Sequence, residues 1–127
     1  GLVIPALDGA PGIYSARWAG ESKDFRIAMQ RVHDELAARG VPMEGAAAHF
    51  VCVIAVARPQ APTKLFRGEV HGHLTWPARG EKGFGYNPIF IASGESLTFA
   101  EMEDDLRYGI THRKRAFDAF VDWLAME

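Results

Sequence analysis

The pattern of apolar and polar positions along this 127-residue chain predicts two amphipathic helices. In residues 24–39, apolar side chains recur at helical spacing with charged residues on the other faces, and Gly40 follows as a stop signal. Near the end of the chain, apolar residues in 116–124 form one stripe, and Thr111 is a candidate N-cap. We therefore predict one helix in each of these segments.

Between the two helices, the pattern changes to one that is typical of strands. The continuous apolar run FVCVIAVA, residues 50–57, is too short for a typical helix and predicts a strand covered on both faces. A second strand is expected at 64–75, where Gly68 permits a bulge or a close backbone approach. Residues 76–88 are rich in Gly and Pro and predict a loop, which leads into a short strand at 89–92.

Composition and charge narrow the class of protein. Apolar residues make up 48% of the chain and charged residues 24%, as in ordinary globular proteins, so we expect one α/β or α+β domain over residues 1–127. The net charge of -2 argues against bulk binding to nucleic acid or a membrane surface. No apolar run approaches the ~20 residues of a membrane span, and a lone cysteine, Cys52, suits a reducing compartment. We therefore expect a cytoplasmic protein without nucleic acid or membrane as partner.

A glycine-rich segment, residues 79–88, departs from ordinary loop composition in a way that is typical of binding sites. Its three glycines let the backbone approach a ligand, and Phe84 offers a flat face for stacking. The alternative is a Gly-rich turn in which Phe84 and Tyr86 only anchor the core. Spacing alone slightly favours this alternative.

The second candidate is the basic segment THRKR, residues 111–115, at the start of the last predicted helix. Basic side chains in a first helical turn are unfavourable by a few tenths to ~1 kcal/mol each, because the helix N-terminus carries partial positive charge. Free N–H groups, a hydroxyl, a histidine and arginines together form a candidate anion or nucleotide site. A solvated basic face, balanced by the acidic residues at 101–105, is an equally good interpretation.

Five sequence words occur in the order of one enzyme family. They are LDGAPGIYSARWAG at 7–20, FRGE at 66–69, GFGYNPIF at 83–90, TFAEM at 98–102, and THR at 111–113 followed by Ala116. By these words the chain resembles the inosine/xanthosine triphosphate pyrophosphatases over nearly its whole length. The resemblance implies an α/β fold with a mixed twisted sheet flanked by helices, two lobes around a central cleft, and a cytosolic homodimer.

The resemblance also implies an activity and a binding site. The activity is Mg²⁺-dependent hydrolysis of ITP, dITP and XTP to the monophosphate and pyrophosphate, which removes non-standard purine nucleotides from the pool. The residues expected to bind the purine nucleoside triphosphate are Phe84, Gly85, Tyr86, Asn87, Arg107, His112 and Arg113. Among them, Phe84 stacks on the base and Arg113 donates to a 6-keto oxygen. An arginine only donates hydrogen bonds, which fits selectivity against the 6-amino group of adenine.

The chain departs from the family pattern at several places. Asn87 stands for the family's Asp, Arg107 for its Lys, and Thr111 for its Ser, so one charge is lost and one cation changes geometry. Gly1-Leu2 matches the end of an Asp-Ser-Gly-Leu word whose Asp is the family's general base. We therefore expect the C-terminal part of such an enzyme, with the N-terminal segment missing. The general base, the phosphate loop and the metal carboxylates are expected upstream of Gly1, and no catalytic or metal residue is assigned within the chain.

Two other functions are compatible with the same residues. The first is a nucleotide-binding or dimer-forming fragment without turnover. The second is a nucleic-acid-binding domain that uses Phe84, Tyr86 and the basic run at 112–115. The net charge of -2 disfavours the second function, because nucleic-acid binding depends on neutralising phosphates.

Overall fold

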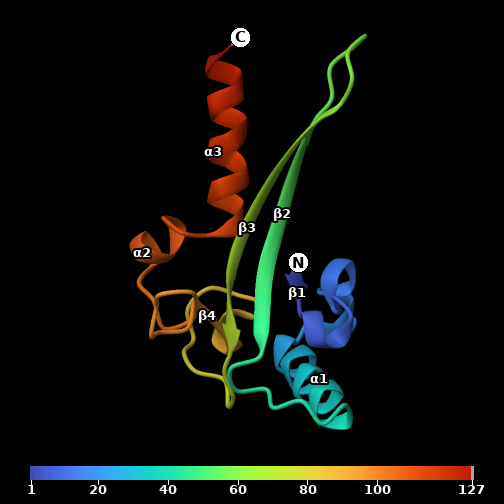
Figure 1. Cartoon of the computed structure of the whole chain (residues 1–127), viewed down its shortest axis with the longest axis vertical. Helices are drawn as coiled ribbons and strands as arrows, with labels where there is room; N and C mark the ends of the chain where they lie inside the picture. The colour runs from blue at the N-terminus through green and yellow to red at the C-terminus, as the bar shows by residue number, and fades with distance from the viewer. Residues whose placement is uncertain (127) are drawn as a thin grey trace.

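The computed structural model describes residues 1–126 and shows a sheet with helices packed beside it (Figure 1). The four strands lie in the order β1 (Leu2–Val3), β2 (Ala47–Val56), β3 (Lys64–Leu74) and β4 (Phe90–Ala92). The α/β class with flanking helices is confirmed. The sheet that we expected to be mixed is antiparallel at each of its three pairings within these residues.

The helices agree with the sequence pattern at both ends of the chain. The α-helices are α1 (Phe25–Ala38), α2 (Asp104–Tyr108) and α3 (His112–Ala125), and single 3-10 turns are η1 (Pro5–Leu7), η2 (Gly12–Tyr14), η3 (Arg17–Ala19) and η4 (Asn87–Ile89). The Asp24 carboxylate caps α1, and the Thr111 hydroxyl caps α3 by accepting from the Lys114 N–H at 3.2 Å. The short helix α2 was not predicted, because five residues show no periodicity.

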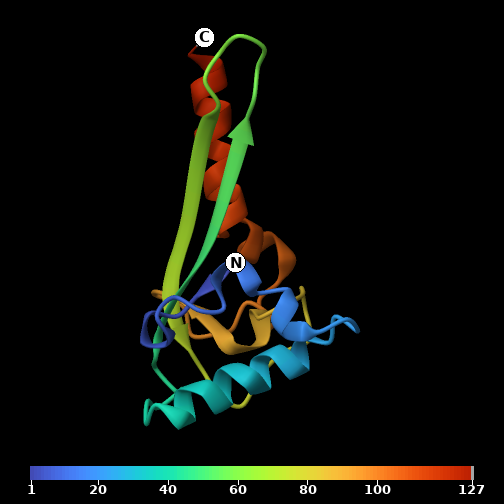
Figure 2. The ribbon, with the colours of Figure 1, turned by 90° about the vertical axis from the view of Figure 1, so that its right-hand side faces the viewer.

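Strands β2 and β3 form a long hairpin that extends well beyond the rest of the sheet (Figures 1 and 2). Helix α3 packs along this hairpin, where the Phe66 ring lies 5.6 Å from that of Phe120 and 5.4 Å from that of Trp123. We expected the apolar run in β2 to be covered on both faces, and this is wrong for its outer part, where Val53 is 48% exposed. Helix α3 lies on one side only.

The molecule therefore has two unequal lobes (Figure 2). The wider lobe contains α1, β1, β4 and the main apolar core, in which the Phe90 ring packs 4.7 Å from Phe50 and 5.1 Å from Phe99. The narrower lobe is formed by the β2–β3 hairpin and α3. This arrangement confirms the two-lobed α/β fold, and it leaves the first turn of α3 at the junction.

The start of α3 is set against β3 by Gly68. A Cβ atom at Gly68 would overlap with the carbonyl oxygen of His112 and with the backbone nitrogen of Ala116. These are backbone atoms, which cannot rotate away as a flexible side chain does. The close approach expected at Gly68 is confirmed, and its consequence is that His112 is held directly over the sheet.

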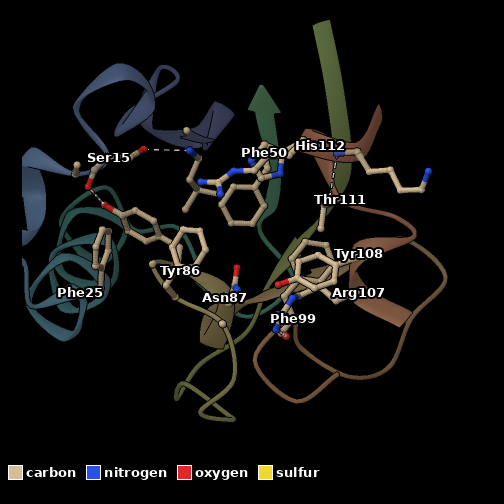
Figure 3. Close-up of a pocket in the computed structure, with 18 of the residues that line it drawn as sticks. Ser15, Phe25, Phe50, Tyr86, Asn87, Phe99, Arg107, Tyr108, Thr111 and His112 are labelled. Atoms are coloured by element: carbon tan, nitrogen blue, oxygen red, sulfur yellow. Dashed lines mark hydrogen bonds between the residues drawn. The ribbon is translucent and has the colours of Figure 1, made fainter. Parts of the chain in front are cut away.

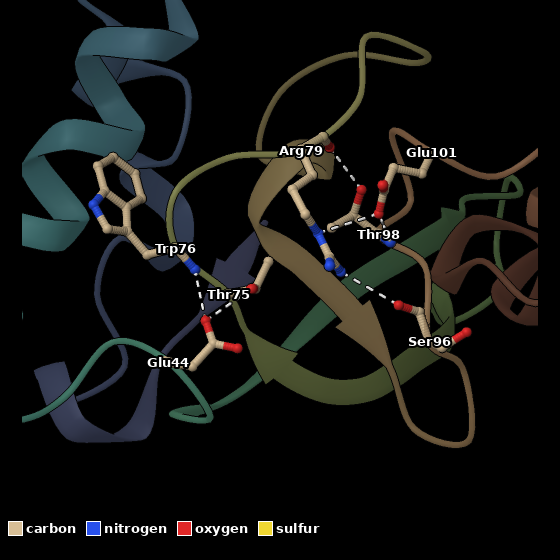
Figure 4. Close-up of polar contacts among 7 residues, drawn as sticks. All are labelled: Glu44, Thr75, Trp76, Arg79, Ser96, Thr98 and Glu101. Atoms are coloured by element: carbon tan, nitrogen blue, oxygen red, sulfur yellow. Dashed lines mark hydrogen bonds and ion pairs between the residues drawn. The ribbon is translucent and has the colours of Figure 1, made fainter.

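The segment that joins β3 to β4 is fastened by polar contacts (Figure 4). The Glu44 carboxylate accepts from the Thr75 hydroxyl at 2.8 Å. Thr98 is fully buried and donates to the Arg79 carbonyl at 2.7 Å. The Glu101 carboxylate in turn accepts from the Thr98 N–H at 3.0 Å and pairs with the Arg79 guanidinium at 3.3 Å. These contacts hold the start of the segment that carries the glycine-rich word.

Candidate functional site

A cavity of about 790 Å³ lies at the junction of the two lobes (Figure 3). Its walls come from β1, the turn at 15–16, single residues of α1 and β2, the glycine-rich segment, α2 and the first turns of α3. All the residues that the sequence nominated for binding line it: Phe84, Gly85, Tyr86, Asn87, Arg107, His112 and Arg113. The fold thus brings the glycine-rich segment and the basic segment to one place, although β4 and α2 separate them along the chain.

Gly83 lets the glycine-rich loop close tightly over two of these side chains. Its φ angle of +74° lies in the left-handed region that favours glycine. A Cβ atom there would overlap with Nδ2 of Asn87 and lie 2.9 Å from Nη1 of Arg107. The Asn87 amide and the Arg107 guanidinium are therefore packed against the loop backbone beside each other.

Tyr86 is the anchor of this loop. Its side chain is 3% exposed, and its hydroxyl donates to the Ser15 carbonyl at 2.7 Å. The ring meets the Phe25 ring edge-on at 5.4 Å. Burial raises the pKa of the Tyr86 hydroxyl well above its ordinary value, so the group stays protonated and serves as a wall of the cavity.

Phe84 and Arg113 form a pair at the rim of the cavity. The Phe84 side chain is 64% exposed, which is unusual for phenylalanine, and the Arg113 Cζ lies 4.8 Å from its ring centroid. This is cation–π geometry. The pair presents a flat ring together with a group that only donates hydrogen bonds.

His112 supplies a different chemistry deeper in the site. Its half-buried ring stacks on Phe50, with centroids 5.1 Å apart and planes 16° from parallel. Burial, helped by the positive charges of the amino terminus and Arg113, lowers the pKa of His112 to about 4, so the imidazole is neutral at pH 7. Its Nδ1 atom is buried and has no hydrogen-bond partner within residues 1–126. A neutral imidazole with such a nitrogen is suited to bind a polar ligand atom.

Arg107 is a buried cation with partners of its own. The side chain is 6% exposed; Nη2 donates to the Asp104 carboxylate at 2.7 Å and Nη1 to the Phe99 carbonyl at 3.3 Å. Sequence reasoning did not identify Asp104 as this partner. The two residues are three positions apart on α2, the helix that was not predicted.

Several other cavity residues were also missed. They include Ser15, which lies within one of the family words but was given no role, together with Phe25, Phe50, Phe99 and Tyr108. The Ser15 hydroxyl donates to the Gly12 carbonyl at 2.7 Å and accepts from the Leu2 N–H at 3.0 Å. The word PGIYSAR at 11–17 was the available signal for Ser15. For the aromatic residues, the sequence pattern does not distinguish a side chain that is buried in the core from one that lines a cavity.

The charged groups of the cavity bear on the metal that the resemblance implies. Asp118 is the one carboxylate among the described lining residues, and it pairs with Lys114 at 2.8 Å. Within residues 1–126 no group of three His, Cys, Asp or Glu side chains is placed to hold a metal ion. The described residues therefore do not fit a Mg²⁺ site.

In the same part of the chain, every helix is too short or too polar to cross a bilayer.

Comparison with known proteins places the chain in a family. The model of the Ham1 family matches residues 1–123. The dITP/XTP pyrophosphatase of Zymomonas mobilis is 50% identical over 117 residues, which is 92% of this chain and 56% of that protein. The corresponding protein of Rhodospirillum centenum is 51% identical, over 92% of this chain and 57% of its own length.

Solved structures agree with the sequence comparison. The Staphylococcus aureus Ham1 protein has a TM-score of 0.89 at 37% identity and is matched over 98% of this chain and 63% of its own. A HAM1 protein from Coxiella burnetii has a TM-score of 0.91 at 32% identity, over 100% of this chain and 64% of its own. This chain spans less than two thirds of the length of these relatives. On this evidence, the chain belongs to the Ham1 family.

Proposed function

We propose that this chain forms the base-binding part of an enzyme that hydrolyses dITP, ITP and XTP to the monophosphate and pyrophosphate. The names of the relatives, dITP/XTP pyrophosphatases, support the reaction. The observation that carries the proposal is the Nδ1 atom of His112, which has no hydrogen-bond partner among residues 1–126 and lies in a cavity that also holds the Phe84–Arg113 pair. These groups offer the stacking surface and the hydrogen bonds that a purine base requires.

The geometry favours a base with a 6-keto oxygen. We infer that the base stacks on the face of Phe84 that Arg113 leaves open, and that the guanidinium donates to the keto oxygen. The 6-amino group of adenine is itself a donor, so an adenine base would set two donors opposite each other and form no hydrogen bond with Arg113. Sites of this kind reject the mismatched analogue strongly, which is the property that a nucleotide-pool sanitation enzyme needs.

The rest of the proposal follows from the resemblance. We propose Mg²⁺ as the cofactor, which would stabilise the charge that develops on the phosphates. Its ligands and the general base are expected outside the cavity residues, so no residue of this chain is assigned a catalytic role. We propose further that residues 1–127 form one domain, and that the protein acts in the cytoplasm as a homodimer.

The test is pyrophosphate release from ITP, XTP and ATP, with and without Mg²⁺, alongside equilibrium binding of the same nucleotides to the 127-residue chain. Binding of ITP and XTP at least about tenfold tighter than ATP is expected. Mg²⁺-dependent release from ITP and XTP alone would show the activity. Equal binding of all three nucleotides would contradict the base pocket.

A nucleotide-binding fragment without turnover is the second candidate. It is favoured by one observation, namely that the described residues do not fit a metal site. Selective binding of ITP and XTP without release of pyrophosphate is the result that it predicts.

A further inference from the structure

Among the residues that the structure describes, some cationic side chains of the cavity form an ion pair with a carboxylate, and one does not. Three cationic side chains line it, namely Arg107, Arg113 and Lys114. Arg107 pairs with Asp104 at 2.7 Å, and Lys114 pairs with Asp118 at 2.8 Å. Arg113 has no carboxylate partner within residues 1–126, and its contact is the Phe84 ring. The rim at which we place the base therefore carries an excess positive charge.

The groups around Arg113 do not neutralise this charge. The ionisable groups facing the cavity from every wall are the Gly1 amino group, Tyr86, Arg107, Tyr108, His112, Arg113, Lys114 and Asp118. Tyr86 and His112 are held neutral by burial, which raises the pKa of the first and lowers the pKa of the second. Asn87, beside Arg107, is an amide that offers a donor and an acceptor but no charge.

The 6-oxopurines differ in charge near neutral pH. Xanthine has a second carbonyl group at position 2, which delocalises the negative charge left when a neighbouring ring N–H ionises. The base of a xanthosine nucleotide is therefore largely an anion at neutral pH. Hypoxanthine lacks this carbonyl group and stays neutral until the solution is distinctly alkaline.

We propose that the pocket distinguishes 6-oxopurines by the charge of the base, and that it prefers the xanthine anion to neutral hypoxanthine. The proposal rests on the proposed function, because it takes the base to lie against Phe84 and Arg113. The neutral amide of Asn87 is a specificity-determining group in this view, since a carboxylate at that position would repel the anion. A single added charge in an open, partly solvated cavity is expected to change affinity roughly fivefold.

The experiment is calorimetric binding of XMP, IMP and AMP to the 127-residue chain at about pH 7.5 and about pH 5. The monophosphates carry the same phosphate group, so its titration cancels in the ratio of XMP to IMP affinity. We expect XMP to bind roughly fivefold tighter than IMP at the higher pH. At the lower pH the xanthine base becomes neutral, and the ratio should approach one. The Gly1 amino group gains positive charge as the pH is lowered, which would favour the anionic base. It would therefore oppose the fall in the ratio of XMP to IMP affinity rather than produce it.

Two substitutions move the charge of the site in opposite directions. Asn87→Asp adds a carboxylate beside Arg107 and should lower the affinity for XMP more than the affinity for IMP, so that the ratio falls toward one. Asp118→Asn removes the carboxylate that pairs with Lys114 and should strengthen the preference for XMP over IMP. The matched control is Asp122→Asn, which makes the same change one turn along α3 at an exposed position outside the cavity and should leave the ratio unchanged.

Each outcome decides between charge and other causes. A ratio that falls with pH and shifts oppositely in the two variants supports the proposal. Equal binding of XMP and IMP at about pH 7.5 overturns it, and so does a preference that persists at about pH 5, which would indicate a hydrogen bond to the 2-carbonyl group. If neither binds better than AMP, the proposed function itself fails, whereas preference for both over AMP with an unchanged ratio refutes this inference alone.

Discussion

At the scale of single residues, the two arginines of the cavity have different environments and so different tasks. Arg107 is 6% exposed and is held by the Asp104 carboxylate and the Phe99 carbonyl, which fix its guanidinium beside Asn87. Arg113 is exposed at the rim, with its guanidinium on the Phe84 ring. Arg113 donates no hydrogen bond to a protein acceptor within residues 1–126, whereas Arg107 donates two, so we assign to Arg113 the contact with the base.

Arg113→Ala should therefore weaken the binding of ITP by roughly tenfold or more, because a charge-assisted hydrogen bond is lost. The binding of ATP should change much less, since adenine has no 6-keto oxygen to accept that bond. Fluorescence or calorimetric titration with both nucleotides measures the difference. Arg115→Ala removes the same charge on the same helix outside this cavity and is the control. An equal loss for ITP and ATP would rule out the proposed contact.

At the scale of elements, the position of α3 on β3 decides where His112 and Arg113 lie. The Thr111 cap determines where the helix begins, and Gly68 determines how closely that first turn approaches the strand. Ala116, one turn farther along α3, is fully buried at the same contact. The helix start and the strand thus form one wall of the cavity.

Gly68→Ala should displace the start of α3, because the new methyl group would overlap with backbone atoms of His112 and Ala116. We expect a loss of roughly 1–3 kcal/mol of stability and weaker binding of IMP. Thermal unfolding and a binding titration measure the two effects. Gly109→Ala is the matched control, because a Cβ there meets no atom closer than 3.6 Å. Unchanged stability and binding in Gly68→Ala would show that α3 is not held by this contact.

At the scale of the whole molecule, the cavity exists only because distant segments meet. The Tyr86 hydroxyl and the Ser15 carbonyl are hydrogen-bonded although they are 71 positions apart. The His112 ring lies on Phe50, a residue of β2 and of the apolar core. The stability of the molecule and the chemistry of the site are therefore coupled through His112.

This coupling predicts a pH dependence of stability. The pKa of His112 is lowered to about 4 in the folded chain from its ordinary value of 6.5. Between these two pH values the unfolded chain binds a proton that the folded chain does not, so the folded state becomes less stable as the pH falls. The equilibrium constant for unfolding then rises by at most about tenfold per pH unit. Above pH 6.5 the contribution is constant. The free energy of unfolding, measured with denaturant at several pH values in this window, should fall less steeply with pH in His112→Gln than in the unchanged chain. An identical pH dependence in both proteins would contradict the prediction.

The local pattern was sufficient for most elements and for the nomination of the site. Helical spacing and a capping hydroxyl located α1 and α3, and Gly68 indicated a close approach before its partner was known. It failed for α2, whose five residues are too few to show a repeated helical spacing, and for the outer part of β2, where Val53 is exposed. An apolar run shows what a strand is able to bury, but not what lies against it.

Periodicity, caps and turns are local properties, so the order of amino acids was enough to predict the family words, the elements that carry them and the residue types of the site. Three features depend on tertiary packing: within residues 1–126, His112 is neutral with an unpartnered nitrogen, Asp104 holds Arg107, and Arg113 has no carboxylate partner. Desolvation and charge pairing depend on which distant segments pack together. No spacing along the chain contains that information.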